Sequence, residues 1–439
     1  MCARKPMAIL DRLQLQPVRR VRGSVPVPGD KSISHRYALF GALARGTTSV
    51  SHLAPGADVA STLACLRGLG VAIETAGPGA VVIHGRGWPG LTAPRRPLDA
   101  GNSGTTMRLL SGILAGCPFR TEVVGDPSLS RRPMRRVIDP LTAMGARIAA
   151  VDGHAPLVID GGGLSPIIWS SPVASAQVKS AILLAGLSAE GTTTVVEPLP
   201  TRDHTERAFP TFGLRVVSSP ETRSVSVTGR QEAVAAAEPL RVPGDPSTAA
   251  VWAAAAAALP GSSVELTGVC LNPHRLGFVR ALERMGARIE LIADGEMAGE
   301  PVGRIRVAHG THQAAVIDPA DVPGLIDELP VLAARAALGG GLAVSGAGEL
   351  RVKESDRISA LVAGLRALGV SADERPDGFV IDGSQRPRGG TADAAADHRL
   401  VMAFSLVALG AAGGSTVTGA EAVAVSYPEF ARELDRLTE

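Results

Sequence analysis

Cationic and hydroxyl side chains gather where helices are expected to begin. The first group, Lys31, Ser32 and Arg36, opens a predicted helix that runs to Ala44. The first turn of a helix favours an anion, because its backbone N–H groups are unpaired and its dipole is positive there. Similar groups stand in the stretches 101–108, 131–133, 351–357 and 397–399. One such arginine alone is more often a surface charge, but five groups predict a shared site for a small, multiply charged anion.

Two carboxylates accompany these cations. Asp327 follows an apolar run and precedes a predicted helix, and Glu354 lies between Lys353 and Arg357. Taken alone, Asp327 is interpreted as a helix cap and Glu354 as a counter-charge for its neighbours. As a pair in a cationic cleft, they would suit proton transfer to and from carbon.

The composition excludes several other classes of function. The chain has 439 residues, 45% hydrophobic and 20% charged, which is typical of a globular protein with two or more domains. Only 3% of residues are aromatic and the net charge is +2, which argues against a nucleic-acid surface. The longest apolar stretch, 251–259, is too short to span a membrane, and the run 7–10 is too short for a signal peptide. The four cysteines form no CxxC pair, so we expect a reducing cytoplasm and no disulfide or zinc framework.

Two glycine-containing stretches match nucleotide-binding motifs only superficially. Asp30 separates Gly29 from Lys31, which breaks the phosphate-loop pattern. In the stretch 85–90, Pro89 leaves no helix to receive a pyrophosphate. A nucleotide cofactor is therefore not expected.

A repeated unit must position the cationic groups. Five stretches end a predicted helix with a glycine and then begin a strand: 66–73, 141–148, 209–216, 282–289 and 365–370. The glycine supplies the left-handed conformation that reverses the chain. Further helices are predicted over 102–115, 177–187 and 398–409. The unit is therefore strand-helix-strand-helix-strand-strand, and it recurs every 70–80 residues or so.

The sixth unit is incomplete at the C-terminal end. A helix predicted over 429–437 has no strand after it, so we expect the stretch 13–18 to complete that unit. The chain would then cross twice between two domains, at the two Val-Pro-Gly-Asp copies, 27–30 and 242–245. Ordinary turns are the alternative. The two copies have the same flanking residues and enclose three repeats, which favours their being the crossings between domains. This predicts one domain over 29–243 and another over 1–28 plus 244–439.

In this order, the motifs resemble the 5-enolpyruvylshikimate-3-phosphate synthase (3-phosphoshikimate 1-carboxyvinyltransferase) family. The stretches 28–36, 101–105, 351–357 and 397–399 carry the resemblance, which extends from about Pro28 to Phe430. It implies an α/β fold of two inside-out domains, each built from three βαβαββ repeats. It also implies transfer of the enolpyruvyl group of phosphoenolpyruvate to a ring hydroxyl of shikimate 3-phosphate, with release of phosphate, in chorismate and aromatic amino acid biosynthesis. We expect a cytoplasmic monomer that uses no metal or organic cofactor and binds neither nucleic acid nor membranes.

The resemblance also implies roles for individual residues. Shikimate 3-phosphate would be held by Lys31, Ser32, Arg36, Ser175, Ala176, Gln177, Arg202, Asp327 and Lys353. Phosphoenolpyruvate would be held by Lys31, Gly104, Arg132, Gln177, Arg357 and Arg399. Asp327 resembles the base that takes the proton of the ring hydroxyl, and Glu354, with Lys31, resembles the acid that protonates the methylene carbon.

Three positions bear on variation within the family. Many members have a serine where this chain has Ala176 and a lysine where it has Val425, so one hydroxyl and one cation are missing. The stretch 201–205 resembles a second branch of the family, some of whose members tolerate glyphosate. The tolerant forms carry an alanine at the position of Gly104, so we expect glyphosate to compete with phosphoenolpyruvate here.

Two alternatives stay open at this point. The sister family, UDP-N-acetylglucosamine enolpyruvyl transferase, normally has a cysteine in the loop that corresponds to 125–133, and this chain has none there. A catalytically silent, anion-binding relative would be expected to lack one of the two carboxylates, and both are present.

Overall fold

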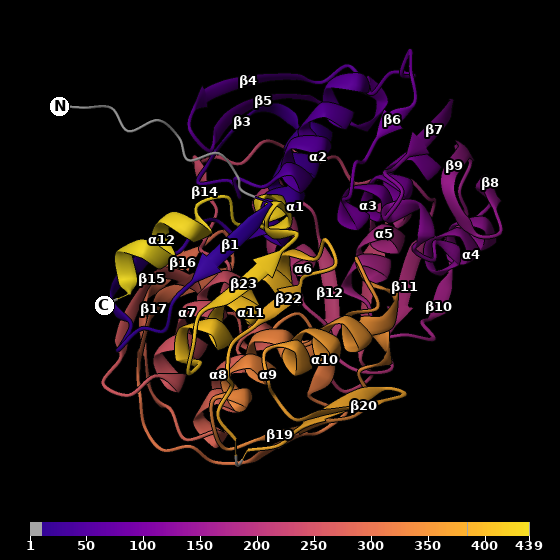
Figure 1. Cartoon of the computed structure of the whole chain (residues 1–439). Coiled ribbons are helices and arrows are strands. Elements are labelled where there is room, and N and C mark those ends of the chain that lie inside the picture. The colour runs from indigo at the N-terminus through magenta and orange to yellow at the C-terminus, as the bar shows by residue number, and fades with distance from the viewer. Residues whose placement is uncertain (1–10, 384, 439) are drawn as a thin grey trace.

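Small sheets of three or four strands, repeated along the chain, make up the outside of the fold. The computed structural model describes residues 11–383 and 385–438, which form six sheets in two lobes (Figure 1). The sheets of the first lobe have the orders β14 (Leu240–Arg241), β3 (Arg45–Ser51), β5 (Ala80–Arg86), β4 (Ala72–Gly77); β6 (Leu98–Asp99), β7 (Arg120–Val124), β9 (His154–Asp160), β8 (Arg147–Val151); and β10 (Ile168–Ser170), β11 (Thr192–Val196), β13 (Ser224–Thr228), β12 (Val216–Ser219). Those of the second lobe have the orders β16 (Arg288–Met297), β17 (Glu300–Ala308), β15 (Ser263–Cys270), β2 (Arg22–Pro26); β18 (Ala315–Ile317), β19 (Leu342–Val344), β21 (Gly378–Ile381), β20 (Ala372–Arg375); and β1 (Arg12–Leu15), β23 (Ser415–Thr418), β22 (Thr391–Asp393).

The pairing within the sheets follows the repeated unit. In the sheet of β6 to β9, for example, β6 runs parallel to β7, whereas β9 is antiparallel to both β7 and β8. The parallel pair needs a crossover, which α3 (Gly104–Ala115) supplies, and α4 (Arg135–Ala143) then connects β7 to β8. This is the predicted βαβαββ order.

One helix of each unit lies inside the lobe. These helices are α1 (Lys31–Leu43), α3 and α5 (Ala176–Gly186) in the first lobe, and α7 (Pro246–Ala258), α9 (Leu329–Ala337) and α11 (His398–Gly410) in the second. Every residue of α7 is buried, which explains the Ala-rich stretch as a helix surrounded by protein. The outer helices are α2 (Ala57–Gly68), α4, α6 (His204–Ala208), α8 (Gly277–Arg284), α10 (Arg357–Ala367) and α12 (Phe430–Leu437). Central helices beneath outer sheets constitute the predicted inside-out arrangement.

The glycines that were predicted to end helices do so. Gly70, Gly145, Gly213, Gly286 and Gly369 all have positive φ angles. The next N–H in each case reaches back over the last turn, as Val71 does to the Leu66 carbonyl at 3.1 Å. These bonds satisfy carbonyls that the helix leaves unpaired.

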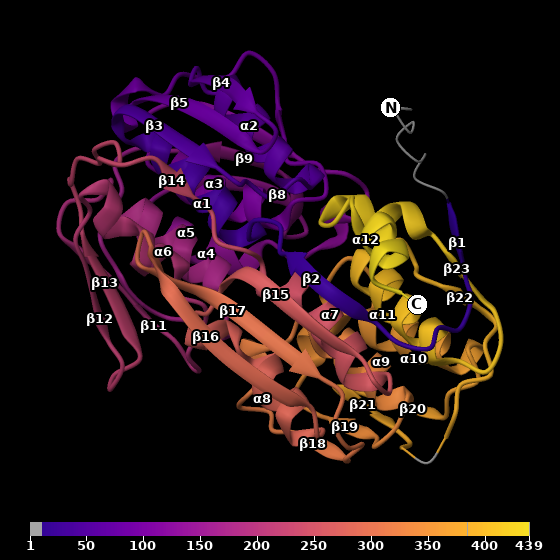
Figure 2. The same cartoon turned by 90° about the vertical axis from the view of Figure 1, so that its left-hand side faces the viewer.

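The segments before α1 and α7 exchange between the lobes. Strand β1 pairs with β23 and β2 pairs with β15, so both early strands belong to second-lobe sheets; Figure 2 shows β2 beside β15. Strand β14, just before α7, pairs with β3 of the first lobe. The two connections run side by side: the Asp30 N–H donates to the Pro243 carbonyl at 2.7 Å, and the Asp245 N–H donates to the Pro28 carbonyl at 2.8 Å.

The buried side chains of the described residues form two hydrophobic cores. One core draws on residues 33–242 together with Cys270, and the other on residues 15–27 and 249–437. Cys65, Cys117 and Cys270 are buried free thiols, whereas Cys2 and the apolar run 7–10 lie outside the described residues. Within the described ranges, no helix has the length and apolar character needed to cross a membrane.

Candidate active site

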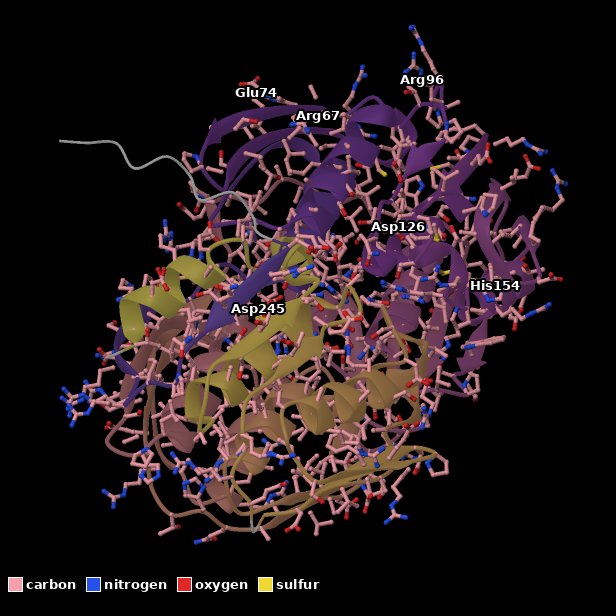
Figure 3. All side chains as sticks on the ribbon, in the orientation of Figure 1. Arg67, Glu74, Arg96, Asp126, His154 and Asp245 are labelled. Atoms are coloured by element: carbon pink, nitrogen blue, oxygen red, sulfur yellow. The ribbon has the colours of Figure 1, made fainter. Side chains whose placement is uncertain are left out.

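A cavity of about 340 Å³ lies where the two lobes meet. All the predicted site residues except Arg36 and Arg357 line it. Asp245, which also lines the cavity, lies near the middle of the molecule in Figure 3, whereas Arg96 and His154 lie at the outer edge of the first lobe. The fold therefore gathers side chains that are up to several hundred positions apart in the sequence.

The inner helices of the first lobe begin at this cavity. Their first residues, Lys31, Gly104 and Ala176, all line it. Each helix is capped by the residue before it: Asp30, Ser103 and Ser175 accept a hydrogen bond from a backbone N–H of the first turn. A cap of this kind sets where the helix starts and so directs its positive end toward the ligand space.

Lys31 reaches the cavity and Arg36 lies behind its wall. The Lys31 ammonium is 3.1 Å from a carboxylate oxygen of Asp58. Arg36 is buried and donates to the Thr205 hydroxyl at 2.8 Å, the Ser180 hydroxyl at 2.8 Å and the Ser32 carbonyl at 2.9 Å. Burial lowers the pKa of Arg36 to about 10, which still leaves it charged at neutral pH. In this structure Arg36 holds Ser32 in place instead of facing the cavity.

Arginines cluster around Gly104. Arg108 donates to the Gln177 amide oxygen at 2.8 Å, and Arg132 donates to the Asn102 amide oxygen at 2.7 Å. A Cβ atom on Gly104 would lie 2.6 Å from Nη1 of Arg108 and 3.4 Å from Nη1 of Arg132. Burial, reinforced by the charges of Arg132 and Arg136, lowers the pKa of Arg108 to about 10. Glycine is therefore needed here for the guanidinium groups to approach the helix start closely.

Asp327 is surrounded by cations from both lobes. Arg202 of the first lobe donates to it at 2.7 Å, and Nε of Arg399 lies 3.8 Å away. Burial raises the pKa of Asp327, but Arg399, Arg202, Lys353 and Arg357 outweigh burial and hold that pKa well below its usual value. The carboxylate is thus ionised in this state, and its affinity for a proton would rise once bound anions neutralised these cations.

Glu354 is paired with Arg357 and faces Arg132. Arg357 is fully buried, donates to Glu354 and donates through Nε to Asp397 at 2.8 Å. Arg132 Nη1 lies 3.5 Å from Glu354 Oε1, which makes a second contact between the lobes. Burial raises the pKa of Glu354, but the charges of Arg357, Arg132 and Lys31 outweigh burial and hold that pKa well below its usual value. Glu354 is therefore a carboxylate in this state, and a role as acid requires its cationic neighbours to be neutralised first.

The remaining predicted residues complete the wall. Gln177 donates to the Thr105 hydroxyl at 2.8 Å, and Ser32 and Ser175 line the cavity beside it. Burial lowers the pKa of Lys353, while Asp327 opposes that effect. Arg357 does not line the cavity but lies beside it, because its Nη1 is 3.8 Å from the lining residue Asp327. This Nη1 has no hydrogen-bond partner among the described residues.

Several lining residues were not predicted. Arg108 and His398 stand inside motifs that the sequence analysis singled out, so a signal for them was present. Burial and the charges of Arg399 and Lys31 lower the pKa of His398 to about 4, so its imidazole is neutral at pH 7. Asp245 ends the second Val-Pro-Gly-Asp copy, so it too had a local signal. Other missed residues have none, because their partners are distant in the sequence: Asp58, Arg136, Arg275 and Glu349.

Known proteins resemble this chain over nearly its whole length. A family model described as EPSP synthase (3-phosphoshikimate 1-carboxyvinyltransferase) matches residues 15–434. A 3-phosphoshikimate 1-carboxyvinyltransferase of Acidithiobacillus ferrooxidans is 50% identical over 422 residues, 96% of each chain. The enzyme of that name from Lactiplantibacillus plantarum is 45% identical over 434 residues, covering 98% of this chain and 100% of the relative. The solved EPSP synthase of Acinetobacter baumannii superimposes with a TM-score of 0.86 at 41% identity, covering 97% of this chain and 98% of that one. The chain therefore belongs to the EPSP synthase family.

Proposed function

We propose that this protein transfers the enolpyruvyl group of phosphoenolpyruvate to a ring hydroxyl of shikimate 3-phosphate and releases phosphate. The observation that carries the proposal is the cavity between the lobes, where Lys31, Arg132, Arg202 and Arg399 surround the carboxylates Asp327 and Glu354. Two phosphates and two carboxylates must be bound close together in this reaction, and a cavity of this charge suits them. The full-length match to enzymes named for this activity favours it over the sister UDP-sugar transferase.

The first lobe would bind the phosphate of shikimate 3-phosphate. Ser175, Ala176 and Gln177 form the start of α5, where free backbone N–H groups favour an anion, and Arg202 adds a guanidinium. Lys31, Ser32, Asp327 and Lys353 would contact the ring, and Arg36 would act by holding Ser32. Because Ala176 has no hydroxyl, its contribution is confined to the backbone.

Phosphoenolpyruvate would occupy the side of the cavity near Gly104. Arg132, Gln177 and Arg399 would bind its anionic groups together with Lys31. The unpaired Nη1 of the buried Arg357 is a further donor. An unpaired buried N–H is costly, so a carboxylate or phosphate oxygen that reached it would bind favourably.

The two carboxylates would carry out the proton transfers of the reaction. Asp327 accepts the proton of the ring hydroxyl while the hydroxyl oxygen bonds to C2 of phosphoenolpyruvate, and Glu354 or Lys31 delivers a proton to the methylene carbon. Loss of phosphate from C2 and of a proton from the new methyl group then forms the product. The cations that now depress the pKa of Glu354, Arg357 foremost, would be partly neutralised by the bound anions, which raises that pKa toward the value an acid needs.

The domain boundaries are part of the same proposal. We place one domain at 29–243 and the other at 1–28 plus 244–439, of which residues 1–10, 384 and 439 lie outside the described part of the chain. The paired crossings and the two separate cores support these limits. The cytoplasmic location, the monomeric state and the absence of a cofactor remain predictions.

Phosphate release tests the proposed activity. Purified protein is given both substrates, and then each one is omitted in turn. Release that requires both substrates is the expected result. No release, with shikimate 3-phosphate still binding by calorimetry, would point to a silent relative, and neither release nor binding would point to the sister enzyme.

A further inference from the structure

Arg136 and Glu349 form an ion pair across the cavity between the lobes. Arg136 is on α4 of the first lobe, and Glu349 is on the short 3-10 helix η6 (Gly348–Val352) of the second. Nη2 of Arg136 donates to Oε1 of Glu349 at 2.9 Å, and Nη1 donates to Oε2 at 2.5 Å. Such a two-pronged arginine–carboxylate pair fixes both the distance and the orientation of its partners.

The pair joins the segments that carry Arg132 and Glu354. Arg136 lies four residues after Arg132, and Glu349 lies five residues before Glu354. A second bond along the same seam runs from the Ser128 hydroxyl to the Glu354 carbonyl at 3.1 Å. The ion pair therefore sets where the Glu354 side chain stands relative to Arg132, 3.5 Å away.

Two other ion pairs across the cavity are of a different kind, whereas Arg275–Asp30, which also joins the lobes, is almost completely buried. Arg202–Asp327 and Arg132–Glu354 consist of residues that are predicted to contact substrates, so bound anions would compete for these arginines. Arg136 and Glu349 also line the cavity, but neither is predicted to contact a substrate. Their pair is partly shielded, with side-chain exposures of 23% and 39%, and it can persist when the cavity is filled.

We propose that Arg136 and Glu349 are positioning residues whose ion pair, the Arg136–Glu349 latch, holds the lobes in the arrangement that brings Glu354 and Arg132 together. This inference rests on the proposed function, because its consequence for catalysis is the placement of Glu354 and Arg132 around phosphoenolpyruvate. The latch contributes no proton and no substrate contact.

A double-mutant cycle tests the coupling between the two residues. The variants are Arg136→Gln, Glu349→Gln, their combination, and the charge-swapped Arg136→Glu/Glu349→Arg, with kcat and KM for phosphoenolpyruvate measured for each. We expect each single variant to lower kcat/KM about tenfold and the combination to be little worse than either single, because both remove the same interaction. The swapped pair should recover part of the loss.

A pair within one lobe provides the matched control. Arg304 donates to Asp294 at 3.0 Å between β17 and β16, so both residues belong to one sheet of the second lobe. Arg304→Gln and Asp294→Asn should leave kcat/KM unchanged. Losses at Arg136 and Glu349 that multiply in the combined variant, or no loss at all, would overturn the latch.

Failure of the proposed function is recognised separately, from wild-type protein that releases no phosphate with both substrates. In that case the latch is tested by small-angle X-ray scattering of the substrate-free wild type and the substrate-free Glu349→Gln variant. The latch predicts a larger radius of gyration for Glu349→Gln than for wild type at low salt, and equal radii would overturn it.

Discussion

Asp30 and Asp245, the corresponding aspartates of the two Val-Pro-Gly-Asp copies, are bridged by a single guanidinium group. Arg275 Nη1 donates to Asp30 at 2.6 Å, and its Nη2 donates to Asp245 at 3.0 Å. Asp30 caps α1 of the first lobe and Asp245 caps α7 of the second. One buried arginine thus ties together the starts of the two helices at which the chain enters each lobe.

Replacement of Arg275 by methionine should destabilise the protein strongly. The substitution leaves the fully buried carboxylate of Asp30 and the largely buried one of Asp245 without their cation, so we expect the free energy of unfolding to fall by about 3–5 kcal/mol. Urea denaturation followed by circular dichroism measures it. Arg304→Met, at an exposed ion pair, should cost no more than about 1 kcal/mol; similar losses at the two sites would contradict the bridging role.

The folded protein should lose stability in acid because carboxylates of the site, such as Asp245, become protonated. Burial raises the pKa of Asp245, but Arg275 and Arg399 outweigh it, so the folded pKa lies below the unfolded value of about 3.9. A carboxyl group whose folded pKa is lowered stabilises the fold above the unfolded pKa, and that stabilisation is lost as the pH falls through the folded pKa. The melting temperature should therefore drop below about pH 4, and less steeply for Asp245→Asn than for wild type. Parallel curves for the two proteins would rule out this source of acid sensitivity.

Asp327→Asn should abolish most of the activity while binding persists. The amide keeps the shape of the side chain but cannot accept the hydroxyl proton, so kcat should fall by a factor of about 10²–10⁴. Shikimate 3-phosphate should bind at least as tightly, because a negative charge among the arginines is removed. Phosphate release measures the loss of turnover, and calorimetry measures the binding of shikimate 3-phosphate, with Asp294→Asn as the control variant for both. Undiminished turnover would show that another group is the base.

Glyphosate should inhibit in competition with phosphoenolpyruvate, and Gly104→Ala should weaken that inhibition. The added methyl group would come within 2.6 Å of Nη1 of Arg108, the end of a flexible side chain, so the guanidinium can move and the fold is kept. We expect the KM for phosphoenolpyruvate to rise and the inhibition constant for glyphosate to rise roughly tenfold or more.

Gly324→Ala is the control for that substitution. At Gly324 the nearest atom to an added Cβ is 3.8 Å away, so kinetics should be unchanged. Wild-type activity that persists in excess glyphosate would refute the prediction, as would a Gly104→Ala enzyme that is inhibited exactly as wild type is.

Local signals in the sequence predicted most of the fold. Helix-ending glycines such as Gly286 mark five of the six units, because a left-handed residue lets the chain turn directly into the next strand. The predicted helices over 102–115, 177–187 and 398–409 correspond to α3, α5 and α11. The predicted helix over 429–437 corresponds to α12, Phe430–Leu437.

Other parts of the site could not be predicted from local signals. The bond between Arg275 and Asp30 joins residues 245 positions apart, and that between Arg136 and Glu349 joins residues 213 apart, so neither leaves a pattern in any short window. A motif also does not distinguish a side chain that faces the ligand space from one that supports it. Arg36 does not line the cavity in this structure, and its Nε, Nη1 and Nη2 donate to Thr205, Ser32 and Ser180.

The paired crossings restrict how the lobes can move. Gly29 lies against Gly244, and a Cβ atom on Gly244 would stand 2.9 Å from the Val27 carbonyl oxygen, so the two segments pack closely backbone to backbone. A single connection would let the lobes rotate about any axis. Two connections that are hydrogen-bonded side by side allow rotation about one hinge axis and resist twisting of one lobe against the other. Opening and closing then have a single degree of freedom. Two ligands that each favour the closed state must act on that same coordinate, so the binding of one makes the binding of the other more favourable, by an amount that is equal in either order.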